Sequence, residues 1–154
     1  MHWLWGIALL AGGVGALNFG IRRGLAAPRV AEAGRPEGLL WREVSMPTCN
    51  AKKLYGWFIP AETPGPALVV MHGWGGNAEM MLALAAPLHA AGYALLLLDA
   101  RCHGQSDGDS FASLPRFAED IESGLHWLAA QPEVDSSALG IVGHSVGAGA
   151  ALLA

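Results

Sequence analysis

Residues 140–149 read GIVGHSVGAG, and this stretch fits two motifs at once. Gly143, Ser145 and Gly147 have the G-x-S-x-G spacing of a sharp turn from a strand into a helix, which exposes a serine hydroxyl. Gly143, Gly147 and Gly149 have the spacing of a phosphate-binding turn in a dinucleotide-binding domain. The two interpretations predict different chemistry, and the remaining sequence has to decide between them.

Composition and charge exclude several classes of protein. Hydrophobic residues make up 53% of the 154 residues and charged residues only 14%, which suggests that part of the chain lies in lipid. The net charge of -4 offers no basic surface, so no nucleic-acid partner is expected. Cys49 and Cys102 form no C-x-x-C pair, which indicates neither a disulfide framework nor a structural zinc site and leaves a single bridge open. No metal or organic cofactor is predicted.

An uncharged segment near the N-terminus is long enough to cross a membrane. Residues 3–21 carry no charged side chain, and at about 1.5 Å per residue such a helix spans roughly the 30 Å hydrocarbon core. Arg22 and Arg23 follow directly, and no Lys or Arg precedes the segment, so the positive-inside rule places the rest of the chain in the cytoplasm. We predict a single-pass anchor over residues 1–23.

A cleaved signal peptide is the alternative interpretation of this segment. Residues 31–33, AEA, have the small-x-small form of a cleavage site, and cleavage there would make the protein secreted or periplasmic. The lack of charge before the apolar run and the arginines directly after it favour the anchor. Residues 24–38 mix Pro, Gly, Ala and charge without an apolar period and are predicted to be a linker, which leaves residues 39–154 as the domain.

The domain alternates strand-like and helix-like patterns. Residues 39–46 and 53–60 are apolar, aromatic-rich runs around a turn and predict a strand pair. Short unbroken apolar runs predict strands buried on both faces at 66–73, 93–100 and 138–143. We therefore expect an α/β fold with a largely parallel sheet, whose ligands bind at the carboxyl ends of the strands.

Two helices are predicted between these strands, and another begins at Val146. Asn77 caps the first, which ends near Gly92. Its helical spacing gathers Met81, Leu84, Ala85 and Leu88. The second is amphipathic, with Phe117, Ile121, Leu125 and Leu128 on one face and Glu119, Asp120 and Glu122 turned outward.

Three unusual loops follow predicted strands: HGWGG at 72–76, DARCHGQSDG at 99–108 and GHSVG at 143–147. Serine attack on a carbonyl requires an exposed hydroxyl, a base, and N–H groups aimed at the developing oxyanion. The third loop offers the Ser145 hydroxyl and the Val146 N–H. The first is placed to add a second donor, which we assign to the Trp74 N–H.

The order of these loops resembles the first half of an α/β-hydrolase-fold serine hydrolase of the esterase, lipase or serine aminopeptidase-like branches. The resemblance implies Ser145 as nucleophile, the backbones of Trp74 and Val146 as oxyanion hole, and a small-molecule or lipid-like acyl substrate carrying an ester, thioester or amide. It assigns supporting roles in the loops to His72, Gly73, Asp99, Arg101, His103 and His144. The other expected partner is the membrane, which the chain meets through its N-terminal helix.

The expected site is incomplete within this sequence. In α/β hydrolases an acid and a histidine follow the serine along the chain, and residues 146–154 contain neither. His103 is the least unsuitable substitute base. We expect an α/β-hydrolase fold truncated after the nucleophile turn, and an inactive fragment.

Two non-hydrolase interpretations remain. A catalytically dead, membrane-tethered interaction module needs none of the missing residues. A dinucleotide-binding protein is less favoured, because its glycine motif belongs on the first strand with an acidic residue about 20 positions later, whereas only seven residues follow Gly147 here.

Overall fold

A computed structural model describes residues 2–24 and 26–154, so Met1 of the predicted anchor and Leu25 of the predicted linker lie outside the described residues. The domain is built on one five-stranded sheet in the order β1-β2-β4-β3-β5. Its strands are β1 (Arg42–Thr48), β2 (Lys52–Ile59), β3 (Gly65–Met71), β4 (Ala94–Leu98) and β5 (Val134–Gly143). The helices are α1 (His2–Gly24), α2 (Leu82–Ala90), α3 (Leu114–Ala129) and α4 (Val146–Ala151), with 3-10 turns η1 (Cys49–Ala51) and η2 (Ala78–Met81).

The sheet is mixed, which corrects the expectation of a largely parallel sheet. β3 pairs in parallel with both β4 and β5, whereas β2 pairs antiparallel with both β1 and β4. The β1–β2 pair is the predicted strand pair, and β2 then runs alongside β4 rather than standing apart. The three parallel strands β3, β4 and β5 nevertheless have their carboxyl ends at the same end of the sheet, where all three unusual loops begin.

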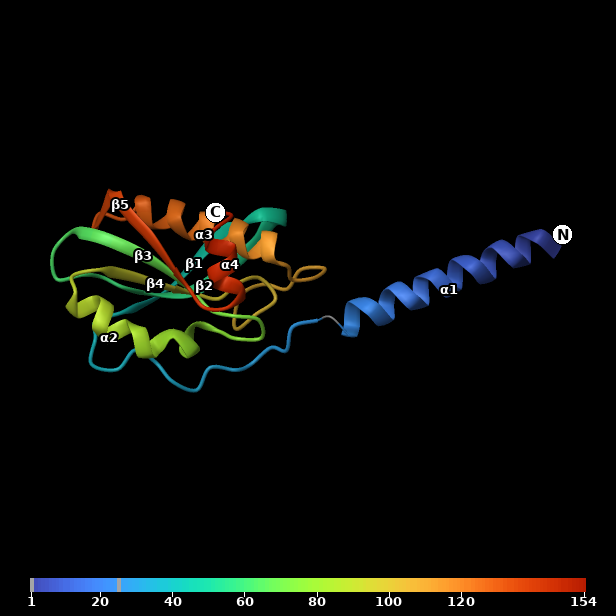
Figure 1. Ribbon diagram of the computed structural model, residues 1–154, viewed down its shortest axis with the longest axis horizontal. Helices are drawn as coiled ribbons and strands as arrows, with labels where there is room; N and C mark the ends of the chain where they lie inside the picture. Colours follow the sequence, from blue (N-terminus) through green and yellow to red (C-terminus); the bar gives the residue numbers. More distant parts are fainter. Residues whose placement is uncertain (1, 25) are drawn as a thin grey trace.

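Helix α3 covers one face of the sheet and helix α2 covers the other (Figure 1), and an apolar layer lies under each. Side chains alternate along a strand, so Ala94, Leu96 and Leu98 of β4 pack with α3, while Leu95 and Leu97 pack with η2 and α2. All five are fully buried. This explains the unbroken apolar run of β4, because neither face meets water. The strand β5 lies at the edge of the sheet.

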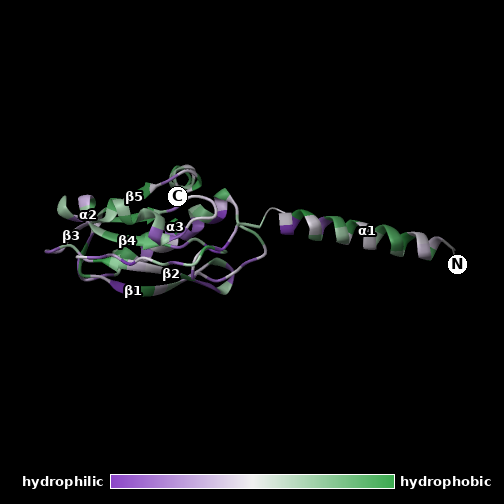
Figure 2. Cartoon of the chain, turned by 90° about the horizontal axis from the view of Figure 1, so that it is seen from below, coloured by the Kyte–Doolittle hydropathy of each residue, from purple (hydrophilic) through white to green (hydrophobic). Residues whose placement is uncertain are grey.

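Helix α1 projects from the domain, and residues 3–24 are exposed along its whole length (Figure 1). It is long and apolar enough to cross a membrane, a test that a signal sequence also passes. In Figure 2, hydrophilic colour gathers at its end next to the domain, where Arg22 and Arg23 form the last turn. Residues 26–38 form no helix or strand and run along the surface of the domain.

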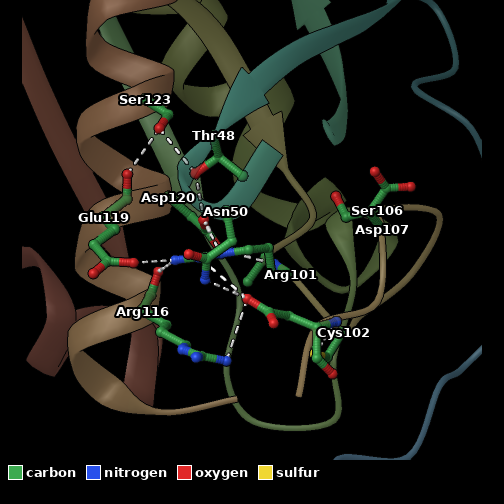
Figure 3. A network of polar contacts seen from close by, with 12 residues as sticks. Thr48, Asn50, Arg101, Cys102, Ser106, Asp107, Arg116, Glu119, Asp120 and Ser123 are labelled. Atoms are coloured by element: carbon green, nitrogen blue, oxygen red, sulfur yellow. Dashed lines mark hydrogen bonds and ion pairs between the residues drawn. The ribbon is translucent and has the colours of Figure 1, made fainter. Parts of the chain in front are cut away.

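A buried ion-pair network fixes the loop after β4, and it corrects the placement of Asp120 (Figure 3). Asp120 does not face solvent. Its carboxylate is buried and accepts hydrogen bonds from Arg101 Nε at 2.7 Å, Arg101 N at 2.8 Å and Thr48 Oγ1 at 2.9 Å. The Arg101 guanidinium also pairs with Glu119 and lies 3.5 Å from Asp109. Helical periodicity predicts an outward position for Asp120, because the periodicity of a helix carries no information about a partner on another loop.

We predict that Asp120→Ala lowers the free energy of unfolding by about 3 kcal/mol, because removing one partner leaves a buried guanidinium only partly compensated. Glu122→Ala is the matched control on an exposed position of the same helix and should change it by less than about 0.5 kcal/mol. Denaturant unfolding measures both. Equal effects of the two substitutions would contradict the role assigned to the network.

Candidate active site

Ser145 sits on a strained turn between β5 and α4. Its φ of 53° and ψ of −117° are rare for a residue with a side chain. The turn is held by hydrogen bonds from His144 N to Met71 O at 3.0 Å and from Gly147 N to His144 O at 2.9 Å. The serine is exposed at the carboxyl end of β5. The strain and the exposure match the geometry that the G-x-S-x-G spacing predicts.

The glycines of the turn make this geometry sterically feasible. A Cβ on Gly143 would lie 2.4 Å from the backbone carbonyl of Gly147, and a Cβ on Gly147 would lie 2.5 Å from His72 O. Both contacts are with backbone, which cannot move aside. A Cβ on Gly149 would meet only Leu114 Cδ1, at 2.9 Å. The glycines that resemble a phosphate-binding turn therefore provide room for the serine turn and for the approach of α4 to β3.

The loop after β3 packs against the serine turn. The position that a Cβ of Gly73 would take lies 3.1 Å from Ser145 Cβ and 3.1 Å from His144 Nδ1. Together the two loops line a cavity of about 400 Å³. Its lining comprises Gly73, Trp74, Gly76, Met80, Met81, Leu84, Gly143, His144 and Ser145. The predicted nucleophile and the predicted oxyanion loop thus share one cavity.

The N–H groups of Trp74 and Val146 have no acceptor in residues 2–24 and 26–154. Two other amides of the loop after β3 are occupied, since Gly76 N donates to Gly73 O at 3.0 Å and Ala78 N donates to Asp99 Oδ1 at 2.7 Å. Two unpaired donors on loops that border the serine are what an oxyanion hole requires.

Asp99 and His72 join the loop after β3 to the loop after β4. Asp99 is fully buried, and its second oxygen accepts from Gln105 N at 2.8 Å. Burial raises the pKa of Asp99 above its usual value. His72 Nε2 accepts from Ala100 N at 3.1 Å, and its Nδ1 lies 2.7 Å from Gly73 O, an arrangement that requires the Nδ1–H tautomer. Both side chains support the loops from inside the molecule.

Two of the histidines near the site, His72 and His103, are buried and engaged inside the loops. Burial lowers the pKa of His72 and of His103 to about 4. His103 Nδ1 is engaged with Arg101 O at 2.9 Å, and its ring packs against the rings of His72, Trp74 and Phe117. His103 Nε2 is buried without a partner among the described residues. His103 lines no part of the cavity, so the structure does not place it as a substitute base, and it leaves His144 exposed on the turn.

The apolar wall of the cavity includes residues that the sequence analysis did not assign to the site. Met80 is 65% exposed and Leu84 is 39% exposed, and both line the cavity. Helical spacing groups Leu84 with Met81, Ala85 and Leu88, and that spacing carries no information about a cavity beside the helix. Among the described residues, no cluster of three or more His, Cys, Asp or Glu could hold a metal ion.

Comparison with known proteins identifies the family. A family model described as "Serine aminopeptidase, S33" matches residues 62–154. The chain belongs to this family of α/β hydrolases. The match confirms the resemblance inferred from the three loops, and it begins just before β3, so it covers all of them.

Curated relatives and solved structures agree with this membership. The chain is 34% identical over 115 residues to a polyketide transferase of Aspergillus fumigatus, covering 73% of this chain and 39% of that protein. It is 31% identical over 115 residues to a thiohydrolase of Aspergillus aculeatus, covering 73% and 36%. The Pyrococcus furiosus esterase Pf2001 superposes with a TM-score of 0.76 at 27% identity, covering 84% of this chain and 50% of that one. The chain therefore spans about two fifths of the length of these curated relatives.

We predict that Gly147→Ala destabilises the protein by more than about 3 kcal/mol, or prevents folding, because its Cβ would overlap backbone atoms. Gly149→Ala is the control, since its Cβ meets only a flexible leucine end, and it should cost less than about 1 kcal/mol. Denaturant unfolding compares the two variants. If Gly147→Ala were as stable as Gly149→Ala, the close approach of α4 to β3 would be wrong.

We also predict that His72 and His103 stay neutral as the pH falls from 7 to 5. Their folded pKa of about 4 lies below the unfolded value of 6.5, so the unfolded state binds more protons in this range. Their contribution to stability is complete above pH 6.5 and is lost as the pH falls toward 4. Imidazole chemical shifts measured against pH test this directly, and a midpoint near 6.5 for either ring would contradict it.

Proposed function

We propose that this chain supplies the nucleophile and the oxyanion hole of a serine hydrolase that cleaves an ester, thioester or amide. Ser145 is the nucleophile, and the N–H groups of Trp74 and Val146 stabilise the oxyanion. The observation that carries the proposal is the strained, exposed Ser145, which shares one cavity with Trp74 and directly precedes Val146. Membership of a family of hydrolases supports the same chemistry.

The proposed reaction proceeds in two acyl transfers. Ser145 Oγ loses its proton to a base and bonds to the carbonyl carbon, whose oxygen becomes an oxyanion facing the Trp74 and Val146 amides. The bond to the leaving alcohol, thiol or amine then breaks, and the leaving group takes up the proton. A water molecule attacks the acyl-serine ester by the same route, releasing the acid and restoring Ser145.

The relatives include a transferase as well as a thiohydrolase, which bears on the second step. An acyl-enzyme serves both outcomes, because only the acceptor differs: water in hydrolysis, or another nucleophile in transfer. We propose hydrolysis for this protein, as in the esterase whose fold it shares. No cofactor takes part in the proposed steps, since the serine and its donors perform them.

The base is the part of the reaction that the described residues do not supply. His72 and His103 are engaged inside the loops, and no described side chain hydrogen bonds to Ser145. We therefore propose that the 154-residue chain by itself does not turn over substrate. We further propose that α1 is a membrane anchor with the domain on the cytoplasmic side, as Arg22 and Arg23 at its end favour.

A fluorophosphonate probe tests the proposed nucleophile. In the product of the native gene, we expect covalent labelling at Ser145, located by peptide mass spectrometry. Ser145→Ala should abolish it, and Ser136→Ala, an exposed serine on the same strand, should leave it unchanged. The 154-residue chain alone should label at least 100-fold more slowly, since general-base catalysis contributes about 10²–10⁴-fold. Labelling that persists in Ser145→Ala, or none in the native product, would refute the assignment.

A further inference from the structure

The segment between α1 and the domain is bound to the candidate active site. Residues 26–34, which we call the strap, run over the loop after β3. Pro28 packs on Gly75, since a Cβ on that glycine would lie 2.9 Å from Pro28 Cγ. Gly75 has a φ of 71°, which suits glycine. Asn77 Nδ2 donates to Val30 O at 3.2 Å. The composition of a linker predicted none of these contacts.

Further along, the strap is held at η2. The carboxylate of Glu79 accepts from Ala33 N at 2.7 Å and from Gly34 N at 2.9 Å. A Cβ on Gly34 would lie 3.0 Å from Glu79 Oε1, so the backbone there approaches the carboxylate closely. Hydrogen bonds to a charged acceptor are about twice as strong as neutral ones. Glu79 directly precedes Met80, which lines the cavity.

The strap also binds the loop after β4. Arg29 Nη1 donates to Gly104 O and to Ser106 O, both at 2.8 Å. Gln105 Nε2 donates to Glu32 at 2.6 Å, and the Glu32 side chain is only 1% exposed. The strap thus joins the loop after β3 to the loop after β4. Its hydrogen bonds connect residues at least 45 positions apart in the sequence, so the strap is part of the tertiary structure of the domain.

The strap limits how far the cavity can lie from α1. Pro28 follows Gly24, the last residue of the helix, by only four positions, and a fully extended chain covers at most about 14 Å in four residues. The headgroup layer on each side of a bilayer is about 5–8 Å thick. A helix that spans the membrane therefore holds Pro28 and the Gly75 loop close to the bilayer surface.

Apolar side chains are exposed at the entrance of the cavity. Trp74 is 43% exposed, next to the Gly75 that carries Pro28, and Met80 is 65% exposed on the same rim. Near the end of α1, a hollow lined by Arg22, Arg29 and Phe111 shows that the loop after β4 also lies against the base of the helix. Apolar side chains that gather in one exposed patch are a feature of membrane interaction sites, as they are of ligand-binding grooves.

We propose that the strap fixes the entrance of the active site at the bilayer surface, and that the site takes acyl substrates that reside in the bilayer. The substrate enters from the lipid side, with its acyl chain along Trp74, Met80 and Leu84 and its carbonyl at Ser145. This inference rests on the proposed function for Ser145 and on α1 spanning the membrane. The contacts of the strap also favour an anchor over a signal peptide, since cleavage after Ala33 would remove the hydrogen bonds of Arg29 and Glu32.

The test lengthens the tether without touching the strap. Twelve Gly/Ser residues are inserted between Gly24 and Pro28 of the native gene product, which adds a flexible span of about 20 Å. The control carries the same insertion after Thr63, in the exposed turn between β2 and β3. All three proteins are reconstituted in phosphatidylcholine vesicles. Two substrates are compared: a long-chain fluorogenic ester dissolved in the vesicles, and water-soluble p-nitrophenyl acetate.

We expect the insertion at the tether to lower turnover of the vesicle ester about ten-fold, because a longer tether lowers the effective concentration of the cavity entrance at the bilayer surface. Turnover of p-nitrophenyl acetate should be unchanged. The Thr63 insertion should change neither. Equal turnover of the vesicle ester in all three proteins would overturn the inference while leaving the proposed function intact. No turnover of either substrate would count against the proposed function instead.

A depth measurement tests the inference without catalysis. A fluorophore is attached to Met80→Cys in a Cys49→Ser background, with the same background lacking Met80→Cys as the control for Cys102. Lipids with a headgroup nitroxide should quench the fluorophore strongly, and the insertion between Gly24 and Pro28 should reduce that quenching at least two-fold. A fluorophore that is not quenched, or is quenched equally with the longer tether, would overturn the placement at the bilayer.

Discussion

The close approach of the start of α4 to the end of β3 is the contact on which the site depends. Gly147 lies where any side chain would overlap His72 O, and Gly143 lies where one would overlap Gly147 itself. Only with both glycines can the chain turn from β5 into α4 with Ser145 at a φ of 53°. This turn lifts the hydroxyl out of the sheet and places it beside the loop that carries Trp74. Asp99 then holds the start of η2, which carries Met80 and Met81 of the cavity wall, by accepting a hydrogen bond from Ala78 N.

Much of this arrangement could be predicted from sequence, because it depends on residues that are close together in the chain. Apolar runs located β3, β4 and β5, and the G-x-S-x-G spacing located the serine turn. The errors concern contacts between residues far apart in the chain. Asp120 looked like part of a solvated helix face, but its partner Arg101 comes from another loop. The direction in which β2 pairs with β4, and the binding of residues 26–34 to the domain, are likewise decided by distant partners.

The strap changes how the N-terminal helix relates to the rest of the molecule. A flexible linker would let the domain sample many orientations above a membrane, and the site would meet soluble and lipid substrates alike. Instead, Arg29 of the strap donates a hydrogen bond to Gly104 O, and Gly34 N of the strap donates one to Glu79. These bonds attach the chain to the domain almost up to the base of α1. The relatives include a transferase and a thiohydrolase. The choice between acyl transfer and hydrolysis would depend on the source of the acyl group and on the acceptor that reaches it. The geometry of access therefore matters as much as the nucleophile.

The central claim is that Ser145 and two backbone amides form one acyl-transfer site. A crystal structure of the native gene product after reaction with an alkyl fluorophosphonate tests it most directly, because the phosphonate imitates the tetrahedral intermediate. The account predicts phosphorus bonded to Ser145 Oγ, with one phosphonyl oxygen about 2.7–3.1 Å from both Trp74 N and Val146 N. A phosphonyl oxygen that points away from both amides, or an adduct on any other residue, would contradict it.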